Sequence, residues 1–249
     1  MENTQLVLLH GAGLGAWIWN KLQPLLQLPS VTVSFPNRDS YKADNHITLD
    51  DYCEAVHREI GTSPRTKVAL VAHSISGVVA CRLSAELGPR LVAFAGIGAI
   101  IPKDGGSFLS ALPFMQRAIT WGTMSIGGTR PPDSVIIKSY CNDLNREDTD
   151  LVLCKYVPES MNLYTQSADH NLPATIPKCY VKLEKDRSID PNLQQQMIRN
   201  LDADRVTPIQ AGHLAMLSEP QLLANALNGF FDRRESKPQP RKTHDPVYP

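Results

Sequence analysis

Short runs of consecutive apolar residues alternate along the chain with segments whose apolar positions recur at helical spacing. Such runs, rich in β-branched side chains, predict strands that are buried on both faces of a sheet. Six of them predict strands, at residues 6–9, 31–35, 67–72, 91–97, 179–183 and 206–209. Helical spacing appears at residues 48–60, 78–87 and 192–201, and in a last helix that ends near Phe231. The alternation predicts an α/β fold with a mostly parallel sheet of about six strands flanked by helices.

The alternation stops between residues 102 and 173. This segment shows turn clusters, such as the one from Gly127 to Pro132, and its sequence has no apolar run typical of a buried strand. We interpret it as a helical cap inserted before the last two strands, with residues 1–101 and 174–232 forming the core. Residues 233–249 are polar, basic and rich in proline, which predicts a disordered tail. Helical patches are expected within the cap at residues 108–121, 133–143 and 147–156.

Ser74 lies where the central strand run changes directly to helical spacing. Its neighbours Ala72, Ser76 and Gly77 are small, as a sharp strand-to-helix turn requires. A serine hydroxyl on such a turn is open to a base and lies near a helix N-terminus that stabilises negative charge. We therefore predict Ser74 as a nucleophile. Because Ala72 and Ser76 replace the glycines of the usual G-x-S-x-G pattern, an ordinary helix N-cap stays an alternative.

A glycine-rich turn, His10 to Ala16, follows the first predicted strand. Glycines let backbone N–H groups turn toward a ligand, and this turn lies at the same sheet edge as Ser74. The lysine and Ser/Thr of a phosphate-binding loop are missing, as are the spacings of a dinucleotide fingerprint. We therefore expect the turn to supply a donor of an oxyanion hole, with the N–H of Ala12 as the first candidate.

His213 has the sequence position that best suits a general base. It follows the last predicted strand on a glycine-containing loop, at the edge where Ser74 is expected. Asp186 follows the preceding strand, where a carboxylate can orient that histidine. Asp190 and Glu184 compete with Asp186 for this role. The other histidines are expected to make structural hydrogen bonds (His10, His73) or to lie in loops, on a helix surface, in the cap or in the tail (His46, His57, His170, His244).

Composition narrows the choice of partner. The 249 residues carry 25 Lys+Arg and 25 Asp+Glu, and no basic stripe with interleaved aromatic residues indicates nucleic acid. Five cysteines without CxxC spacing argue against a disulfide framework and a zinc site, and most are expected to be buried thiols. The sequence shows neither a signal-peptide pattern nor an apolar run of about 18 residues. We expect a cytoplasmic protein with a small-molecule substrate, no cofactor, and no nucleic-acid or membrane partner; a homodimer stays open.

Two stretches resemble one particular family. The run from His10 to Leu26, HGAGLGAWIWNKLQPLL, and the run from Ala211 to Pro220, AGHLAMLSEP, resemble the plant methyl esterase and hydroxynitrile lyase branch of the α/β-hydrolases. The order serine, aspartate, histidine agrees with that fold. The resemblance covers the core and reaches the cap only in length and helical character. It implies an α/β-hydrolase fold with Ser74 as nucleophile, His213 as base, Asp186 as orienting acid, and the N–H groups of Ala12 and Ile75 as oxyanion hole.

Two positions separate esterases from lyases within this branch. The lyases carry a threonine and a lysine where this chain has Gly11 and Leu214, so the resemblance implies a serine carboxylesterase that uses a methyl ester or another small ester. A hydroxynitrile lyase, another C–C or lactone-cleaving enzyme, and a ligand-binding protein with vestigial activity stay alternatives. Apolar cap residues are expected to line a pocket for an apolar or aromatic acyl group, foremost Trp121, Met115 and Met124.

Overall fold

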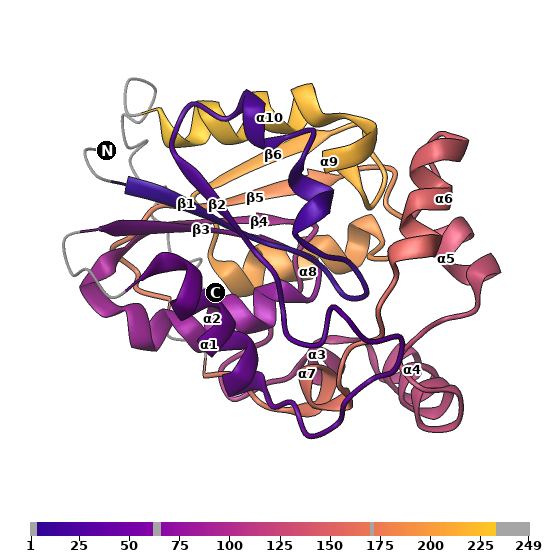
Figure 1. Ribbon diagram of the computed structural model, residues 1–249. Helices are drawn as coiled ribbons and strands as arrows, with labels where there is room; N and C mark the ends of the chain where they lie inside the picture. Colours follow the sequence, from indigo (N-terminus) through magenta and orange to yellow (C-terminus); the bar gives the residue numbers. More distant parts are fainter. Residues whose placement is uncertain (1–3, 62–65, 170–171, 233–249) are drawn as a thin grey trace, which may run out of the picture.

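The computed structural model describes residues 4–61, 66–169 and 172–232, so the predicted tail lies outside the described residues. At its centre is a six-stranded sheet in the order β2-β1-β3-β4-β5-β6, with every neighbouring pair parallel (Figure 1). This confirms the predicted α/β class. The strands are β1 (Thr4–Leu9), β2 (Ser30–Val33), β3 (Lys67–His73), β4 (Leu91–Ile97), β5 (Lys178–Leu183) and β6 (Arg205–Ile209).

Helices cover both faces of the sheet. Alternate strand residues point to opposite faces, so Leu70 and Ala72 join one core whereas Ala69 and Val71 join the other. The first core packs against α1 (Leu49–Ile60), α2 (Ser76–Leu87) and α8 (Pro191–Leu201). The second core packs against α9 (Ala215–Ser218) and α10 (Pro220–Phe231), on the upper side of the sheet in Figure 1. Short 3-10 turns complete this part of the chain: η1 (Ala16–Trp19), η2 (Gln23–Leu25) and η3 (Gly88–Arg90).

The ends of two elements are fixed by identifiable hydrogen bonds. Strand β2 ends at Val33, short of the predicted end at residue 35, because the N–H of Phe35 donates to the imidazole Nε2 of His10 (3.2 Å). Helix α1 begins after Thr48, whose side chain and backbone exchange hydrogen bonds with Asp51 in a capping box. This capping confirms the predicted start of that helix.

Residues between β4 and β5 form five short helices within the described part of the chain. The first predicted patch is divided at Pro113, because a residue before proline avoids the helical conformation and Leu112 is extended. The division into core and cap stays a prediction. Within residues 4–61, 66–169 and 172–232, no helix has the length and hydropathy needed to cross a membrane. The five helices are α3 (Phe108–Ala111), α4 (Phe114–Gly127), α5 (Asp133–Ser139), α6 (Arg146–Lys155) and α7 (Met161–Thr165).

Candidate active site

Ser74 occupies the turn between β3 and α2. Its φ of 58° lies in the left-handed region, which is rare for a residue with a side chain and typical of a nucleophile elbow. The turn is held in place because Ser74 N–H donates to Ile97 O (3.2 Å) and Ile100 N–H donates to Ser74 O (2.9 Å). Hydrogen bonds to the end of β4 and the residues after it therefore maintain a backbone conformation that local preference disfavours.

The structure accommodates Ser76, one of the two departures from the usual glycine pattern. Ser76 is buried, and its hydroxyl lies 2.9 Å from Leu9 O and 2.8 Å from His73 O. It therefore donates to backbone carbonyls at the ends of β1 and β3. The backbone passes closest to a neighbouring segment at Gly77, the residue after Ser76. A Cβ at Gly77 would lie 2.3 Å from Ile100 O, which no side chain allows. The elbow is thus built around Ser76 and Gly77.

His213 and Asp186 form a buried hydrogen-bonded pair. The Nδ1 of His213 lies 2.8 Å from Asp186 Oδ2, and the exposed fractions of the two residues are 2% and 4%. Asp186 Oδ1 accepts the N–H groups of Ser188 (2.7 Å) and Ile189 (2.9 Å), which fixes the carboxylate plane. Because a carboxylate only accepts, Nδ1 of His213 carries a proton, and in the neutral imidazole Nε2 then keeps a free electron pair.

The acids that compete with Asp186 in the sequence have other partners. Asp190 is the N-cap of α8 and accepts the N–H of Asn192 (2.9 Å). Glu184 pairs with Lys182 Nζ at 3.0 Å. His213 Nδ1 donates its hydrogen bond to Asp186, so Asp186 is the one of these three acids that pairs with His213.

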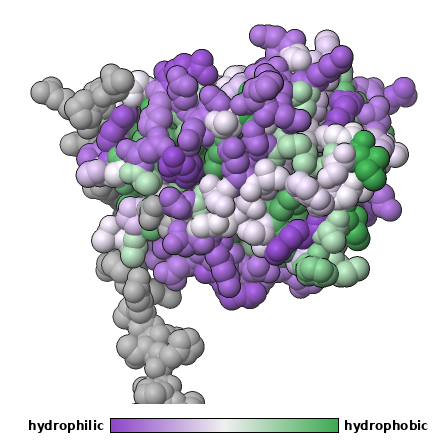
Figure 2. All heavy atoms as spheres, turned by 90° about the horizontal axis from the view of Figure 1, so that it is seen from below, coloured by the Kyte–Doolittle hydropathy of each residue, from purple (hydrophilic) through white to green (hydrophobic). Residues whose placement is uncertain are grey.

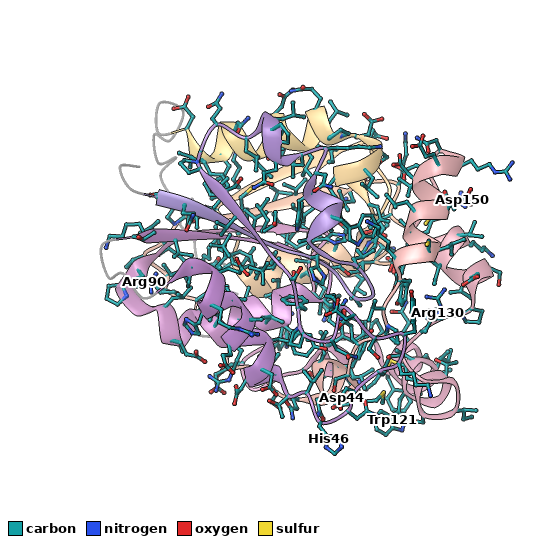
Figure 3. All side chains as sticks on the ribbon, in the orientation of Figure 1. Asp44, His46, Arg90, Trp121, Arg130 and Asp150 are labelled. Carbon is teal, nitrogen blue, oxygen red and sulfur yellow. The ribbon has the colours of Figure 1, made fainter. Side chains whose placement is uncertain are left out.

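Two buried histidines hold the backbone of the site. His73 Nε2 donates to the carbonyl of His213 (2.9 Å), and the two rings lie 4.7 Å apart. Burial lowers the pKa of His73 well below its ordinary value, and the pKa of His10 falls to about 3 for the same reason. Both side chains are therefore neutral hydrogen-bonding groups, as predicted. His46, by contrast, is exposed at the molecular surface (Figure 3).

The glycine loop lies directly beside the elbow. A Cβ at Gly11 would lie 2.9 Å from His73 Nδ1 and 3.0 Å from Ser74 Cβ. Ala12 follows in this loop, and Ile75 is the N-cap of α2. Among the described residues no hydrogen bond joins Ser74 Oγ to His213 Nε2; in unliganded enzymes this contact often tightens only when substrate binds.

Comparison with known proteins shows which family the chain belongs to. A model of the α/β-hydrolase family matches residues 6–226. The chain belongs to the α/β-hydrolase family. Among solved structures, an extracellular α/β-hydrolase from a Paenibacillus species superimposes with a TM-score of 0.79 at 19% identity, covering 90% of this chain and 97% of that chain.

Several curated relatives of this hydrolase carry esterase names. Polyneuridine aldehyde esterase of Rauvolfia serpentina is 24% identical over 267 residues, which cover 93% of this chain and 97% of that protein. Methylesterase 2 of Arabidopsis thaliana is 26% identical over a match that covers 91% of this chain and 95% of that protein. Norfluorocurarine synthase 2 of a Strychnos species is 25% identical over a match that covers 91% of this chain and 94% of that protein. The polyneuridine aldehyde esterase and methylesterase names confirm the predicted branch and support esterase chemistry in general.

The hydrolase holds its site with three residues that the sequence analysis missed. The ring of Tyr140 lies 5.1 Å from that of His213, and Asp143 accepts the N–H of Gly212 on the histidine loop. Glu159 accepts the N–H of Gly13 on the glycine loop. Their partners are 69 to 146 positions away in the chain, so no local pattern could reveal them.

The predicted acyl-pocket residues are largely at the surface. Met115 and Trp121 on α4 are 67% and 49% exposed, whereas Met124 packs against the larger core. Trp121 lies at the lower edge of the molecule, away from the sheet (Figure 3). Hydrophobic residues gather on one side of the lower face (Figure 2). Leu214 is fully buried beside His213. A role for α4 in substrate binding stays a prediction.

Proposed function

We propose that this α/β-hydrolase is a serine carboxylesterase that cleaves a small apolar or aromatic ester, foremost a methyl ester, through an acyl-enzyme. One observation carries the proposal: the buried 2.8 Å hydrogen bond between Asp186 and His213, beside the elbow on which Ser74 is held at positive φ. The esterase names of the relatives support it.

In the proposed mechanism Ser74 Oγ attacks the ester carbonyl while His213 Nε2 takes its proton. The N–H groups of Ala12 and Ile75 donate hydrogen bonds to the carbonyl oxygen and stabilise the negative charge that develops on it. His213 then returns the proton to the departing alcohol, and water, activated by the same nitrogen, hydrolyses the acyl-enzyme. Asp186 keeps the imidazole in the required tautomer and stabilises the imidazolium.

Two positions favour ester hydrolysis over hydroxynitrile cleavage. Leu214 is an uncharged, fully buried residue, so this position supplies no cation to stabilise a departing cyanide. Gly11 has no hydroxyl that could hold a cyanohydrin, and a Cβ there would approach His73 and Ser74 to about 3 Å. The site is therefore better suited to an ester.

The test compares the wild type with Ser74→Ala on a panel of methyl and p-nitrophenyl esters that includes mandelonitrile. We expect ester turnover in the wild type and a loss of about 10⁶-fold in kcat in Ser74→Ala, with an unchanged melting temperature. A fluorophosphonate probe should label the wild type only. A folded wild type that is inert to every ester and to the probe would indicate a binding protein. Mandelonitrile cleavage without ester turnover would indicate a lyase.

A further inference from the structure

Glu159 is a buried carboxylate that the proposed mechanism does not use. It lies between α6 and α7, and its side chain has no exposed area. Burying a charge costs several kcal/mol unless partners compensate for it. Three donors from three separate segments surround this carboxylate: the N–H of Gly13 (3.0 Å), Nη2 of Arg38 (2.6 Å) and the hydroxyl of Tyr52 (2.9 Å). All three are donors, which suits an ionised carboxylate.

The same segment holds Gly13 from two further directions. The N–H of Val157 donates to Gly13 O (3.0 Å), which complements the bond from Gly13 N–H to Glu159. The ring of Tyr156 packs so closely that a Cβ at Gly13 would lie 2.1 Å from its Cζ. Gly13 has a φ of 77°, so a residue with a side chain would also be strained there. Residues 156–159 thus fix the loop immediately after Ala12.

Arg38 links Glu159 to two backbone carbonyls, one of them in the segment that follows Gly13. Its Nη1 donates to Leu14 O (2.6 Å) and its Nε donates to Pro36 O (3.1 Å), while Nη2 pairs with Glu159. A lone carboxylate here would oppose the negative charge that an ester oxygen acquires in the transition state. The guanidinium pairs with Glu159, so the loop is held by charge-assisted hydrogen bonds and the charge of the carboxylate is compensated.

We propose that Glu159, together with Arg38, is a positioning residue that holds the glycine loop so that the Ala12 N–H faces the developing oxyanion. The inference rests on the proposed function and deepens it. A donor stabilises a transition state only if its orientation is fixed before the reaction, because reorganisation during the step costs free energy. The segment between β4 and β5 therefore contributes to catalysis through the loop it clamps.

The chain offers a matched control for this test. Asp148, on α6, is also a buried carboxylate that joins the segment between β4 and β5 to the rest of the molecule, through Lys21 Nζ at 2.7 Å. Its bonds do not reach the glycine loop; they go to Lys21 and Asn145. Asp148→Asn and Glu159→Gln thus remove the same charge from comparable positions.

The experiment measures kcat, KM and melting temperature for both variants with one ester that the wild type hydrolyses. It adds the inhibition constant of a trifluoromethyl ketone analogue of that ester, which binds a serine esterase as an oxyanion adduct. In Glu159→Gln an amide N–H₂ must face one of the three donors. We expect kcat and the affinity for the ketone to fall together by about 10- to 100-fold, less than the loss of a whole oxyanion donor. KM should change little, and Asp148→Asn should keep wild-type kcat.

The outcomes separate this inference from the proposed function. An active wild type whose Glu159→Gln variant retains kcat and ketone affinity overturns the inference alone. A drop that Asp148→Asn shares in full also overturns it, because the effect would then be structural. A wild type that hydrolyses no ester overturns both. If Glu159→Gln does not fold, Arg38→Lys takes its place: it keeps the charge but cannot reach Leu14, Pro36 and Glu159 together.

Discussion

Replacing Asp186 by asparagine tests the candidate triad most directly, because the surrounding backbone dictates how the new side chain must turn. Oδ1 accepts two backbone N–H groups, from Ser188 and Ile189, and these donors cannot reverse. The amide oxygen of the new side chain would therefore stay on that side, and its N–H₂ would face Nδ1 of His213. Nδ1 must then accept, which moves the imidazole proton to Nε2. In this tautomer His213 cannot take the proton of Ser74.

The expected loss follows from that tautomer. In serine proteases the same replacement lowers kcat by about 10⁴-fold, which corresponds to about 5.5 kcal/mol of activation free energy. The fold should survive, because both backbone hydrogen bonds are kept, although all three bonds lose the charge of the carboxylate, at a cost of about 1 to 3 kcal/mol in the free energy of unfolding. Activity and stability should thus separate clearly.

The assay measures kcat for an ester that the wild type hydrolyses, alongside urea denaturation. Asp190→Asn is the matched control: it makes the same chemical change at the N-cap of α8, where asparagine and aspartate cap equally well. It should keep wild-type kcat and stability. If folded Asp186→Asn retains kcat to within about tenfold, the triad reasoning is refuted.

Two further predictions concern stability. Gly77→Ala places a Cβ 2.3 Å from Ile100 O and should lower the free energy of unfolding by about 1 to 3 kcal/mol. Gly122→Ala on α4 has open space around the new Cβ and should raise the free energy of unfolding by about 0.5 to 1 kcal/mol. Urea titrations that rank the two variants in the opposite order would contradict this prediction. Acid should destabilise the fold: the pKa of His10 is about 3 when folded and 6.5 when unfolded, so the unfolded chain binds the extra proton. Between pH 6.5 and about 3 this histidine alone lowers the free energy of unfolding by about 1.4 kcal/mol per pH unit, and buried His73, whose pKa is also lowered, adds to the fall. A free energy of unfolding that stays constant through that window would rule out the neutral, buried His10.

Local pattern was enough to predict the sheet and the three chemistry-bearing turns. Buried strands require apolar runs and sharp turns require small residues, so the six strands, the glycine-rich turn after β1, the elbow at Ser74 and the loop before His213 are visible in the sequence. Since parallel strands place their carboxyl ends at one edge, the order of elements also predicts that these turns meet. The sequence pattern could not show which acid pairs with His213, because Asp186, Asp190 and Glu184 all follow the same strand.

The tertiary structure decided what depends on contacts between distant segments. In the folded chain Asp186 pairs with His213, Asp190 caps helix α8, and Glu159 accepts a hydrogen bond from Gly13, 146 positions away. The tertiary structure also exposes Met115 and Trp121, whose apolar character alone predicts a buried pocket. The sequence determines periodicity, since each element needs its own apolar pattern, whereas the partner of a polar side chain depends on which segments folding brings together.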